Sequence, residues 1–281
     1  MTNTPQTVLI TGCSSGIGRA TAERLAKKGH TVYATARRLE SIEELQGTGC
    51  RVLGLDVTDE GSMSEAVRAV QEAEGGIDAL VNNAGYSQNG AVESIPLEAI
   101  RAQFETNVFG LIRMSQLVLP GMRERRSGRI VNIGSMGGRF TFPGGGVYHA
   151  TKHAVEAISD AMRFESGGFG VQVVLLEPGL IKTEFATTSV GSISDAEDGV
   201  YAHFNSAVGA VTTRAYEGPL GKLGGGPGAV AKVVEKAITA ERPRARYTVT
   251  PSARLLLAQR ALLPDSLWDR AVASTFPRPG D

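Results

Sequence analysis

The amino-acid sequence predicts an α/β protein built on one parallel sheet with helices on both faces. The first observation is that short apolar runs alternate with amphipathic helical patterns over the first two-thirds of the chain. The second is that most of these runs are rich in Val, Ile and Leu without strict alternation, which is typical of strands covered on both faces. The predicted strands are Thr7–Thr11, Thr31–Ala36, Arg51–Leu55, Ala79–Asn82, Arg129–Gly134 and Val171–Glu177.

Helical patterns separate these strands, the clearest being Gly18–Lys28, Asp59–Glu74, Ile100–Arg125 and Val147–Glu165. Alternation of strands and helices predicts a parallel sheet, and right-handed crossovers make it doubly wound. Ligands bind beyond the carboxyl ends of the strands in such a sheet. No composition break and no internal repeat marks a second domain, so residues 1–281 are expected to form a single domain.

Two segments depart from the alternation. Residues 184–226 are rich in Gly, Ser, Thr and Ala and too long for a plain connector, so we expect a substrate lid, with disorder as the alternative. Residues 250–281 combine a Leu-rich stretch, Leu255–Leu263, with four prolines, and we expect a short packed helix followed by an irregular tail. Because arginines interrupt this short apolar run, packing or a pocket wall is favoured over contact with lipid.

The composition argues against several classes of protein. Lys plus Arg and Asp plus Glu number 29 each, so no charge excess favours nucleic acid or an anionic membrane. A basic cluster at Arg123, Arg125, Arg126 and Arg129 surrounds a predicted helix end, where cations complement the helix dipole. The segment Met1–Gln6 has no apolar signal region, no run reaches the roughly 18 apolar residues of a membrane span, and two cysteines are too few for a disulfide framework. We therefore expect a cytoplasmic protein with no nucleic-acid partner and no integral membrane segment.

A glycine-rich turn follows the first predicted strand and leads into a helix, with the sequence Thr11-Gly12-Cys13-Ser14-Ser15-Gly16-Ile17-Gly18. Glycines let the backbone turn tightly and approach a pyrophosphate, whose charge is met by N–H groups at the helix start. Between a strand and a helix this pattern predicts a dinucleotide site, and a turn without a ligand is the alternative. We expect Cys13 to fill the tight loop rather than to act as a reactive thiol.

Tyr148 and Lys152 lie four residues apart in a predicted helix, so they share one face. A free tyrosine titrates at about 10, too high for efficient acid–base chemistry at neutral pH. An ammonium beside the ring favours the phenolate and moves the pKa of the tyrosine toward the working range. The pair therefore indicates acid–base chemistry, and a solvated Tyr–Lys pair on a surface helix is the alternative.

Further motifs accompany the glycine turn in a fixed order between residues 7 and 183. They are Asp56 after the third strand, Asn82-Asn83-Ala84-Gly85 after the fourth, Ser135 after the fifth, Tyr148-His149-Ala150-Thr151-Lys152 in the next helix and Pro178-Gly179-Leu180-Ile181-Lys182-Thr183 after the sixth. In its glycine spacing and in this order the chain resembles the short-chain dehydrogenase/reductase family. We expect a Rossmann-type sheet with strand order 3-2-1-4-5-6-7, the seventh strand lying at Ala245–Val249.

The resemblance implies a role for each motif. Tyr148 would be the general acid in reduction and the general base in oxidation, Lys152 would also hold the nicotinamide ribose, and Ser135 would hydrogen-bond the substrate oxygen. Asn107 interrupts a long helical pattern, where its side chain can admit a water, and would join a proton relay to the lysine. The residues expected to bind the dinucleotide are Gly12, Ser14, Ser15, Gly16, Ile17, Gly18, Arg37, Arg38, Asp56, Val57, Asn83, Ala84, Gly85, Tyr148, Lys152, Pro178, Gly179, Ile181 and Thr183.

The end of the second predicted strand favours NADP(H) over NAD(H). NAD-binding folds place an acidic residue there for the ribose 2′-hydroxyl, whereas this strand ends in Arg37 and Arg38 with no acid before Glu40. Arginine suits a 2′-phosphate, which it can hold through two hydrogen bonds. Ser15 stands where many NADP-binding relatives carry a basic residue, so NAD(H) is kept as the alternative.

The substrate class follows from a looser likeness. Tyr33-Ala34-Thr35-Ala36-Arg37, the long segment 184–226 and Arg246-Tyr247-Thr248-Val249-Thr250 look similar to 17β-hydroxysteroid and retinol dehydrogenases, which implies a steroid-, retinoid- or lipid-like ketone or alcohol. A non-catalytic NADP(H)-binding sensor or regulatory protein of the same fold is the alternative. Such proteins usually lose the tyrosine, lysine or serine, and this chain keeps all three.

Assembly and metal binding complete the sequence-based picture. The family commonly pairs the helices predicted at Ile100–Arg125 and Val147–Glu165 across a twofold axis, so we expect a homo-oligomer, either a dimer or a tetramer. His149 and His153 are spaced like a metal pair, but the Glu between them and the third ligand of a zinc site are missing. No metal is therefore expected.

Overall fold

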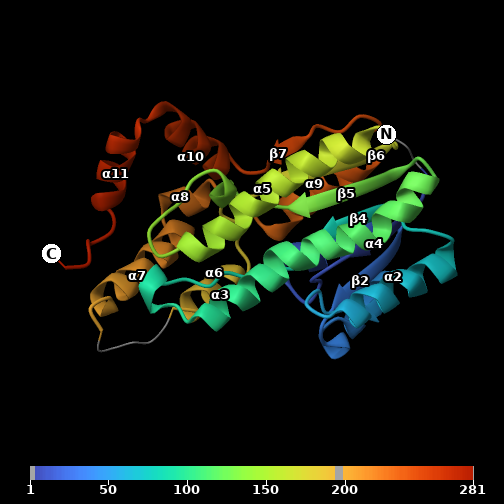
Figure 1. The fold of residues 1–281 in the computed structure, drawn as a ribbon, viewed down its shortest axis with the longest axis horizontal. Coiled ribbons are helices and arrows are strands. Elements are labelled where there is room, and N and C mark those ends of the chain that lie inside the picture. Colours follow the sequence, from blue (N-terminus) through green and yellow to red (C-terminus); the bar gives the residue numbers. More distant parts are fainter. Residues whose placement is uncertain (1–3, 194–198, 281) are drawn as a thin grey trace.

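The computed structural model describes residues 4–193 and 199–280. A seven-stranded parallel sheet lies at its centre, in the order β3-β2-β1-β4-β5-β6-β7 (Figure 1). The predicted fold class and strand order are thereby confirmed. The strands are β1 (Thr7–Ile10), β2 (Thr31–Ala36), β3 (Arg51–Gly54), β4 (Ala79–Asn82), β5 (Gly128–Ile133), β6 (Val171–Glu177) and β7 (Arg246–Thr248).

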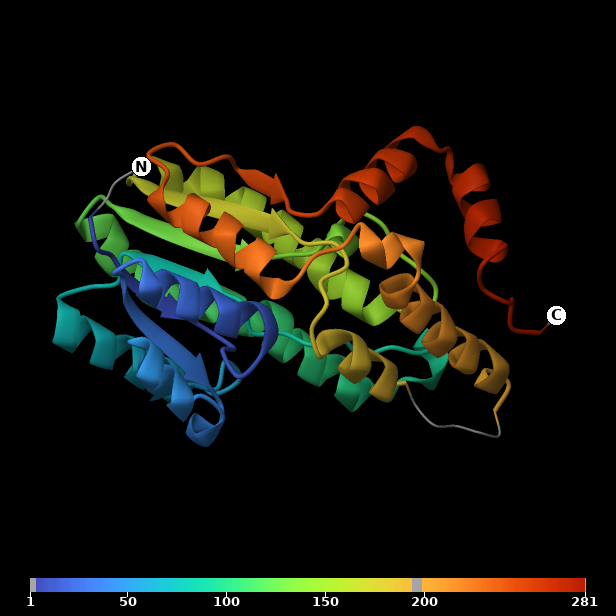
Figure 2. The same ribbon diagram turned by 180° about the vertical axis from the view of Figure 1, so that it is seen from behind.

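Helices cover both faces of this sheet. Figure 1 shows α2, α4 and α5 in front of the strands, and Figure 2 shows α1 and α9 on the opposite face. The helices near the sheet are α1 (Gly16–Lys27), α2 (Glu60–Glu74), α4 (Gly110–Glu124), α5 (Gly146–Gly167) and α9 (Pro227–Thr239). Those beyond its carboxyl edge are α6 (Phe185–Gly191), α7 (Ala202–Glu217), α8 (Pro219–Lys222), α10 (Pro251–Leu262) and α11 (Asp265–Ala273). Helix α3 (Leu97–Phe104) lies beside α6 and α7 (Figure 1).

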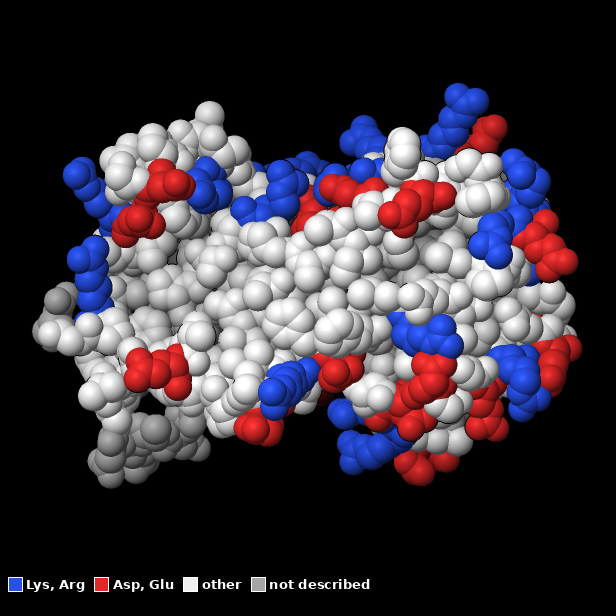
Figure 3. Space-filling model, in the orientation of Figure 1, with Lys and Arg blue, Asp and Glu red and all other residues white. Residues whose placement is uncertain are grey.

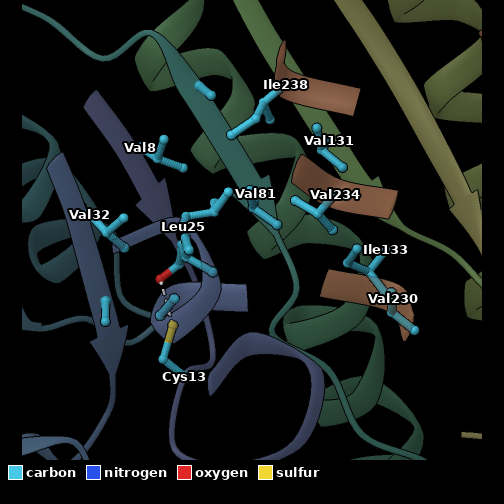
Figure 4. Close-up of a cluster of buried hydrophobic side chains, with 14 of the residues drawn as sticks. Val8, Cys13, Leu25, Val32, Val81, Val131, Ile133, Val230, Val234 and Ile238 are labelled. Atoms are coloured by element: carbon cyan, nitrogen blue, oxygen red, sulfur yellow. Dashed lines mark hydrogen bonds between the residues drawn. The ribbon is translucent and has the colours of Figure 1, made fainter. Parts of the chain in front are cut away.

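The core lies in two layers because successive side chains of a strand point to opposite faces. Val8 packs with Leu25 of α1 and Val234 of α9, whereas its neighbour Leu9 joins the cluster under α2 and α4. Figure 4 shows the first cluster, in which side chains from both helices interlock over the strands. All four of these side chains are fully buried. Both faces of the sheet are thus fixed, which leaves the carboxyl ends of the strands as the place for a site.

The helix predicted over Ile100–Arg125 is divided into three parts. It begins earlier, at Leu97, and a π-helical turn, η4 (Glu105–Phe109), separates α3 from α4. Asn107 lies in this turn, with its side chain bonded to the backbone of Tyr86 rather than exposed to solvent. The predicted interruption is therefore present, and its physical cause is the wider turn that accommodates these bonds.

The end of the chain is more regular than the sequence indicated. The expected packed helix is α10, begun by Pro251 and capped by the Thr250 hydroxyl, which accepts a hydrogen bond from the Ala253 N–H at 3.3 Å. The expected irregular tail is wrong in part, because α11 follows. Trp268 of α11 stacks on Phe142 with ring centroids 5.8 Å apart, a tertiary contact that a local pattern does not reveal. Within the described residues, no helix is long and apolar enough to cross a membrane.

The segment 184–226 contains α6, α7 and α8, so its described parts are helical. Residues 194–198 of this expected lid lie outside the described residues. The four arginines of the basic cluster mostly bond main-chain oxygens. Arg125 donates to the Ile77 carbonyl at 2.8 Å, Arg126 to the Gly168 carbonyl at 3.0 Å, and Arg129 to the Ala240 carbonyl at 3.1 Å. These bonds hold the ends of helices and strands together.

Candidate active site

The glycine-rich turn is packed tightly against the end of β4. Gly12 has a φ of +72°, in the left-handed region, and a Cβ added there would lie 2.8 Å from the Cα of Ala84. The Thr11 hydroxyl accepts hydrogen bonds from the N–H groups of Asn83 and Ala84, both at 3.0 Å. A Cβ on Gly18 would lie 2.2 Å from the Gly12 carbonyl oxygen. Only glycine fits at these positions, and the close packing fixes the start of α1.

The N-terminus of α1 faces a cavity of about 1410 Å³. No acidic residue lies in the first turn of α1, so the positive end of its dipole is not neutralised there. The cavity runs along the carboxyl ends of the strands, as the fold class predicts. Most of the residues expected to bind the dinucleotide line it, namely Gly12, Ser14, Ser15, Gly16, Ile17, Arg37, Asp56, Val57, Asn83, Ala84, Gly85, Tyr148, Lys152, Pro178, Gly179, Ile181 and Thr183.

Two residues expected in the dinucleotide site do not line the cavity. Gly18 is packed under the turn against Gly12, and Arg38 is exposed beside the cavity-lining Arg37. Only the first of the two neighbouring arginines therefore faces this site. No described carboxylate forms an ion pair with Arg37. The glycine cradle, the open helix N-terminus and this unpaired guanidinium together fit an anionic dinucleotide.

Three candidate catalytic side chains meet at the middle of the cavity. Tyr148 and Lys152 come from α5, and the Lys152 Nζ lies 5.9 Å from the centroid of the tyrosine ring. Ser135 stands between β5 and the 3-10 turn η5 (Met136–Gly138), where its hydroxyl accepts a hydrogen bond from the Gly137 N–H at 3.0 Å. The Ser135 side chain also hydrogen-bonds Tyr148. The sequence motifs from two separate elements are thus brought together.

Burial dominates the electrostatics of these groups. It raises the pKa of Tyr148 to about 12, and the hydrogen bond from Ser135 opposes this increase. It lowers the pKa of Lys152 to about 8, with the charge of Glu156 acting in the opposite direction. Our expectation that the lysine lowers the tyrosine pKa is therefore wrong for the polypeptide itself. The reason is the burial of the phenol, and the Lys152 ammonium donates to the Ile133 carbonyl at 2.8 Å.

Asn107 lies behind this group rather than on the cavity surface. Its Oδ1 accepts from the Tyr86 N–H at 3.0 Å, and its Nδ2 donates to the Tyr86 carbonyl at 2.9 Å and to the Thr151 hydroxyl at 3.0 Å. A Cβ added to Gly85 would lie 3.0 Å from the Asn107 Oδ1 and 3.9 Å from the Lys152 Nζ. Because Gly85 has no side chain, the side-chain amide of Asn107 can approach Lys152. The proton relay itself stays a prediction.

Aromatic side chains form the rest of the cavity wall. Phe140, Phe142 and Trp268 make a cluster with centroids 5.0 to 5.8 Å apart, and Phe185 of α6 packs 5.5 Å from the Tyr148 ring. Val208, Val211, Leu256 and Phe276 extend this apolar lining from α7, α10 and the chain after α11. The sequence indicated the two segments that contain Val208, Val211 and Leu256, but not which side chains of those segments face the cavity.

The histidines and the loop cysteine have structural surroundings. The Nδ1 of His149 contacts the Gly137 carbonyl at 2.8 Å, and the Nδ1 of His153 contacts the His149 carbonyl at 2.8 Å. Burial lowers the pKa of His149, so its imidazole is neutral at pH 7. Cys13 is fully buried, and burial raises its pKa to about 12. The interpretation of Cys13 as a filler of the loop is confirmed. No group of metal-ligand residues is present in ranges 4–193 and 199–280.

Comparison with known proteins identifies the family. The model of the short chain dehydrogenase family matches residues 6–192. The NADPH-dependent 3-dehydrocapnine reductase of Ornithobacterium rhinotracheale is 35% identical over 275 residues, covering 93% of this chain and 94% of that protein. The 3-ketodihydrosphingosine reductase of Bacteroides thetaiotaomicron is 35% identical over 273 residues, covering 95% and 97%.

A solved structure gives the same result for the fold. The closed form of a serine dehydrogenase complexed with NADP+ superimposes with a TM-score of 0.75 at 30% identity, covering 87% of this chain and 94% of that one. The fold of this chain therefore agrees with the comparisons. The chain belongs to the short-chain dehydrogenase family of oxidoreductases.

Proposed function

We propose that this oxidoreductase uses NADP(H) to interconvert a lipophilic ketone or aldehyde with its alcohol. The observation that carries the proposal is the cavity itself. Its lining combines Arg37 and the glycine turn, the group Ser135, Tyr148 and Lys152, and aromatic side chains. A site with this lining accommodates an anionic dinucleotide and an apolar carbonyl compound together.

The protein groups divide the chemistry of reduction among them. Bound NADPH supplies a hydride to the carbonyl carbon. The Tyr148 hydroxyl gives its proton to the carbonyl oxygen, and Ser135 donates a hydrogen bond to the same oxygen as negative charge develops. Lys152 would hold the nicotinamide ribose beside Tyr148. In the reverse reaction the Tyr148 phenolate takes the proton from the alcohol.

NADP(H) is the preferred cofactor because of the second strand. Arg37 meets the cavity where that strand ends, and no acidic residue stands there to accept a bond from a free 2′-hydroxyl. The name of the relative from Ornithobacterium includes NADPH, and the serine dehydrogenase was solved with NADP+. Both support NADP(H) over NAD(H).

The substrate is proposed from the wall chemistry and from the relatives. Phe140, Phe142 and Trp268 form an aromatic wall, with the Arg260 guanidinium over the Trp268 ring at 5.7 Å, and their ring surfaces favour an apolar chain or ring system. Two relatives are named as reductases of 3-dehydrocapnine and 3-ketodihydrosphingosine. Segments 184–226 and 250–281 bring α7, α10 and α11 around this aromatic wall, which supports their role as lid and closing tail.

The test is a screen of NADPH consumption by the purified protein across long-chain 3-ketones, steroids, retinoids and small ketones. We expect turnover of lipophilic carbonyls with kcat/KM at least about tenfold above that of acetone-sized ketones, because each buried CH₂ contributes about 0.8 kcal/mol. Preference for small polar ketones would contradict the substrate class. NADPH binding with no turnover of any carbonyl would favour the alternative function, a non-catalytic NADP(H)-binding sensor or regulatory protein.

Assembly and location are part of the same proposal. Phe164 of α5 is 91% exposed, and Phe109 at the start of α4 is also exposed. Figure 3 shows an uncharged band across the middle of this face of the molecule, with charged side chains along its margins. We propose that α4 and α5 pair with a second copy, which light scattering at micromolar concentration tests. The two free cysteines are consistent with a cytoplasmic location.

A further inference from the structure

A buried carboxylate lies directly behind the catalytic lysine. Glu156 follows Lys152 by four residues on α5, so both lie on the same face of the helix, and Glu156 is 7% exposed. Its Oε2 accepts a hydrogen bond from the Arg246 Nε of β7 at 3.2 Å. Its Oε1 is buried and has no hydrogen-bond partner among the described residues. Acidic side chains are rarely so buried, and half of this carboxylate is without a donor.

The unpartnered oxygen rests against the turn that carries Ser135. A Cβ added to Gly138 would lie 3.2 Å from the Glu156 Oε1 and 2.8 Å from its Cγ. A Cβ added to Gly134 would lie 3.6 Å from the same oxygen. These two glycines stand on either side of Ser135. The Glu156 side chain is therefore wedged between α5 and the backbone that sets the position of the serine.

A second buried carboxylate joins the same cluster. Glu177, at the end of β6, is 2% exposed and accepts hydrogen bonds from the Thr248 hydroxyl at 2.9 Å and from the Arg139 Nη1 at 3.3 Å. The Arg246 Nε lies 3.7 Å from its Oε1. The cluster thus ties β6 and β7 to the chain just after η5.

The charged groups that face Glu156 come from every element around it. They are Lys152 and Asp160 on α5, Glu177 on β6, Arg139 next to η5, and Arg246 on β7. Burial, together with the charge of Glu177, raises the pKa of Glu156 to about 7. The charge of Glu156 raises the pKa of Lys152, in opposition to the effect of burial.

We propose that Glu156 is a positioning residue for the reaction, which keeps Lys152 charged through its carboxylate and holds the Ser135 turn against α5 through its side-chain body. This proposal rests on the roles given to Lys152 and Ser135 under the proposed function. Glu156 itself does not line the cavity. It acts through two residues that do.

The charge effect is tested without substrate or nucleotide. Trace labelling of the purified protein with isotope-coded acetic anhydride, followed by mass spectrometry of the Lys152 peptide, gives the titration midpoint of that lysine. In Glu156→Gln, which keeps the shape and removes the charge, we expect the midpoint to fall by about one pH unit, since an opposite charge nearby favours the ammonium. Glu156→Asp, which keeps the charge, should stay near the wild-type midpoint.

A matched control is available on the same helix. Asp160 bonds the same Arg246 but lies one turn farther from Lys152 and is more exposed. Asp160→Asn should leave the Lys152 midpoint and the turnover unchanged. An unchanged midpoint in Glu156→Gln, or an equal fall in Asp160→Asn, would overturn the charge effect. If Glu156→Gln does not fold, Glu156→Met combined with Arg246→Met replaces it, because apolar residues are tolerated where both partners of a buried ion pair are replaced together.

The wedge effect is tested by steady-state kinetics once a carbonyl substrate is identified. Glu156→Asp keeps the charge but withdraws the side chain from Gly138, so we expect kcat to fall about tenfold while KM for NADPH stays within about twofold. If Glu156→Asp retained the wild-type kcat, the proposed role of the Glu156 side chain in holding the Ser135 turn would be wrong. The labelling result does not depend on turnover, so failure of the substrate screen and failure of the Glu156 proposal are distinguishable.

Discussion

The Lys152 ammonium lies 5.9 Å from the centroid of the Tyr148 ring, with Lys152 buried and Tyr148 partly buried. The two groups are held from different directions. Lys152 donates to a main-chain carbonyl of β5, and Tyr148 bonds Ser135 beyond that strand. Burial favours the neutral form of each, so the tyrosine keeps its proton at neutral pH. A proton donor for reduction is therefore built into the resting site.

Replacing Tyr148 with phenylalanine removes only the hydroxyl. We expect kcat for carbonyl reduction to fall at least about a hundredfold, because positioned acid catalysis contributes a factor of that size or more. The dissociation constant for NADPH should change by less than about threefold, and the melting temperature should be retained. Turnover above about one-hundredth of the wild-type value would contradict the assigned role of Tyr148.

The raised pKa of Tyr148 sets the direction of the pH dependence. Reduction needs the neutral phenol, which is the main form below the raised pKa of about 12, so its rate should be flat through neutrality and fall only at alkaline pH. Alcohol oxidation needs the phenolate, whose fraction rises about tenfold per pH unit below that pKa. Initial rates in both directions at matched cofactor saturation check this. An oxidation rate that does not rise with pH would be inconsistent with Tyr148 as the base.

Arg37 should determine the choice of nucleotide, with Arg38 as the matched control. Arg37 lines the cavity and Arg38 does not. Arg37→Asp should lower kcat/KM for NADPH roughly tenfold to a hundredfold and improve that for NADH, because one charge-assisted hydrogen-bond pair is lost and a ribose acceptor is gained. Arg38→Asp should change either value by less than about threefold. Equal losses in the two variants would show a general charge effect instead.

The packing of the glycine turn gives a prediction for stability. A methyl group on Gly18 would lie 2.2 Å from the Gly12 carbonyl oxygen, which is backbone and cannot rotate away. We expect Gly18→Ala to lower the free energy of unfolding by about 1–3 kcal/mol and to weaken NADPH binding. The control is Gly228→Ala in α9, where a Cβ meets nothing within 4 Å and a neutral or slightly stabilising effect is expected. Chemical denaturation of both variants provides the comparison.

Much of the fold and half of the site could be predicted from local patterns. Runs such as Val171–Glu177 have the composition of a strand covered on both faces, and β6 has the same bounds. The glycine turn could be predicted because its glycines determine the path of the backbone. The four-residue spacing of Tyr148 and Lys152 places both side chains on the same face of a helix. Arg37 and Arg38 could not be distinguished by sequence, because the direction of a side chain after a strand depends on the turn.

The remaining features depend on tertiary contacts. Nothing in the tail sequence indicates that Trp268 packs on Phe142, so α11 was missed. The direction of the Tyr148 pKa follows from burial by α6 and α7, which lie far along the chain. Glu156 and Glu177 lie on different elements, and in the sequence each resembles an ordinary surface acid. Both are buried because α5 packs on the end of β6.

The most direct test of the proposed activity follows the transferred hydrogen itself. NADPH carrying deuterium at the reactive nicotinamide carbon is incubated with the wild-type protein and the best lipophilic ketone, and the alcohol is analysed by mass spectrometry. We expect one deuterium on the former carbonyl carbon of each product molecule. The Tyr148→Phe variant should form this alcohol only at its strongly reduced rate. An alcohol without deuterium, or NADPH binding with no alcohol formed from any ketone tested, would contradict hydride transfer at this site.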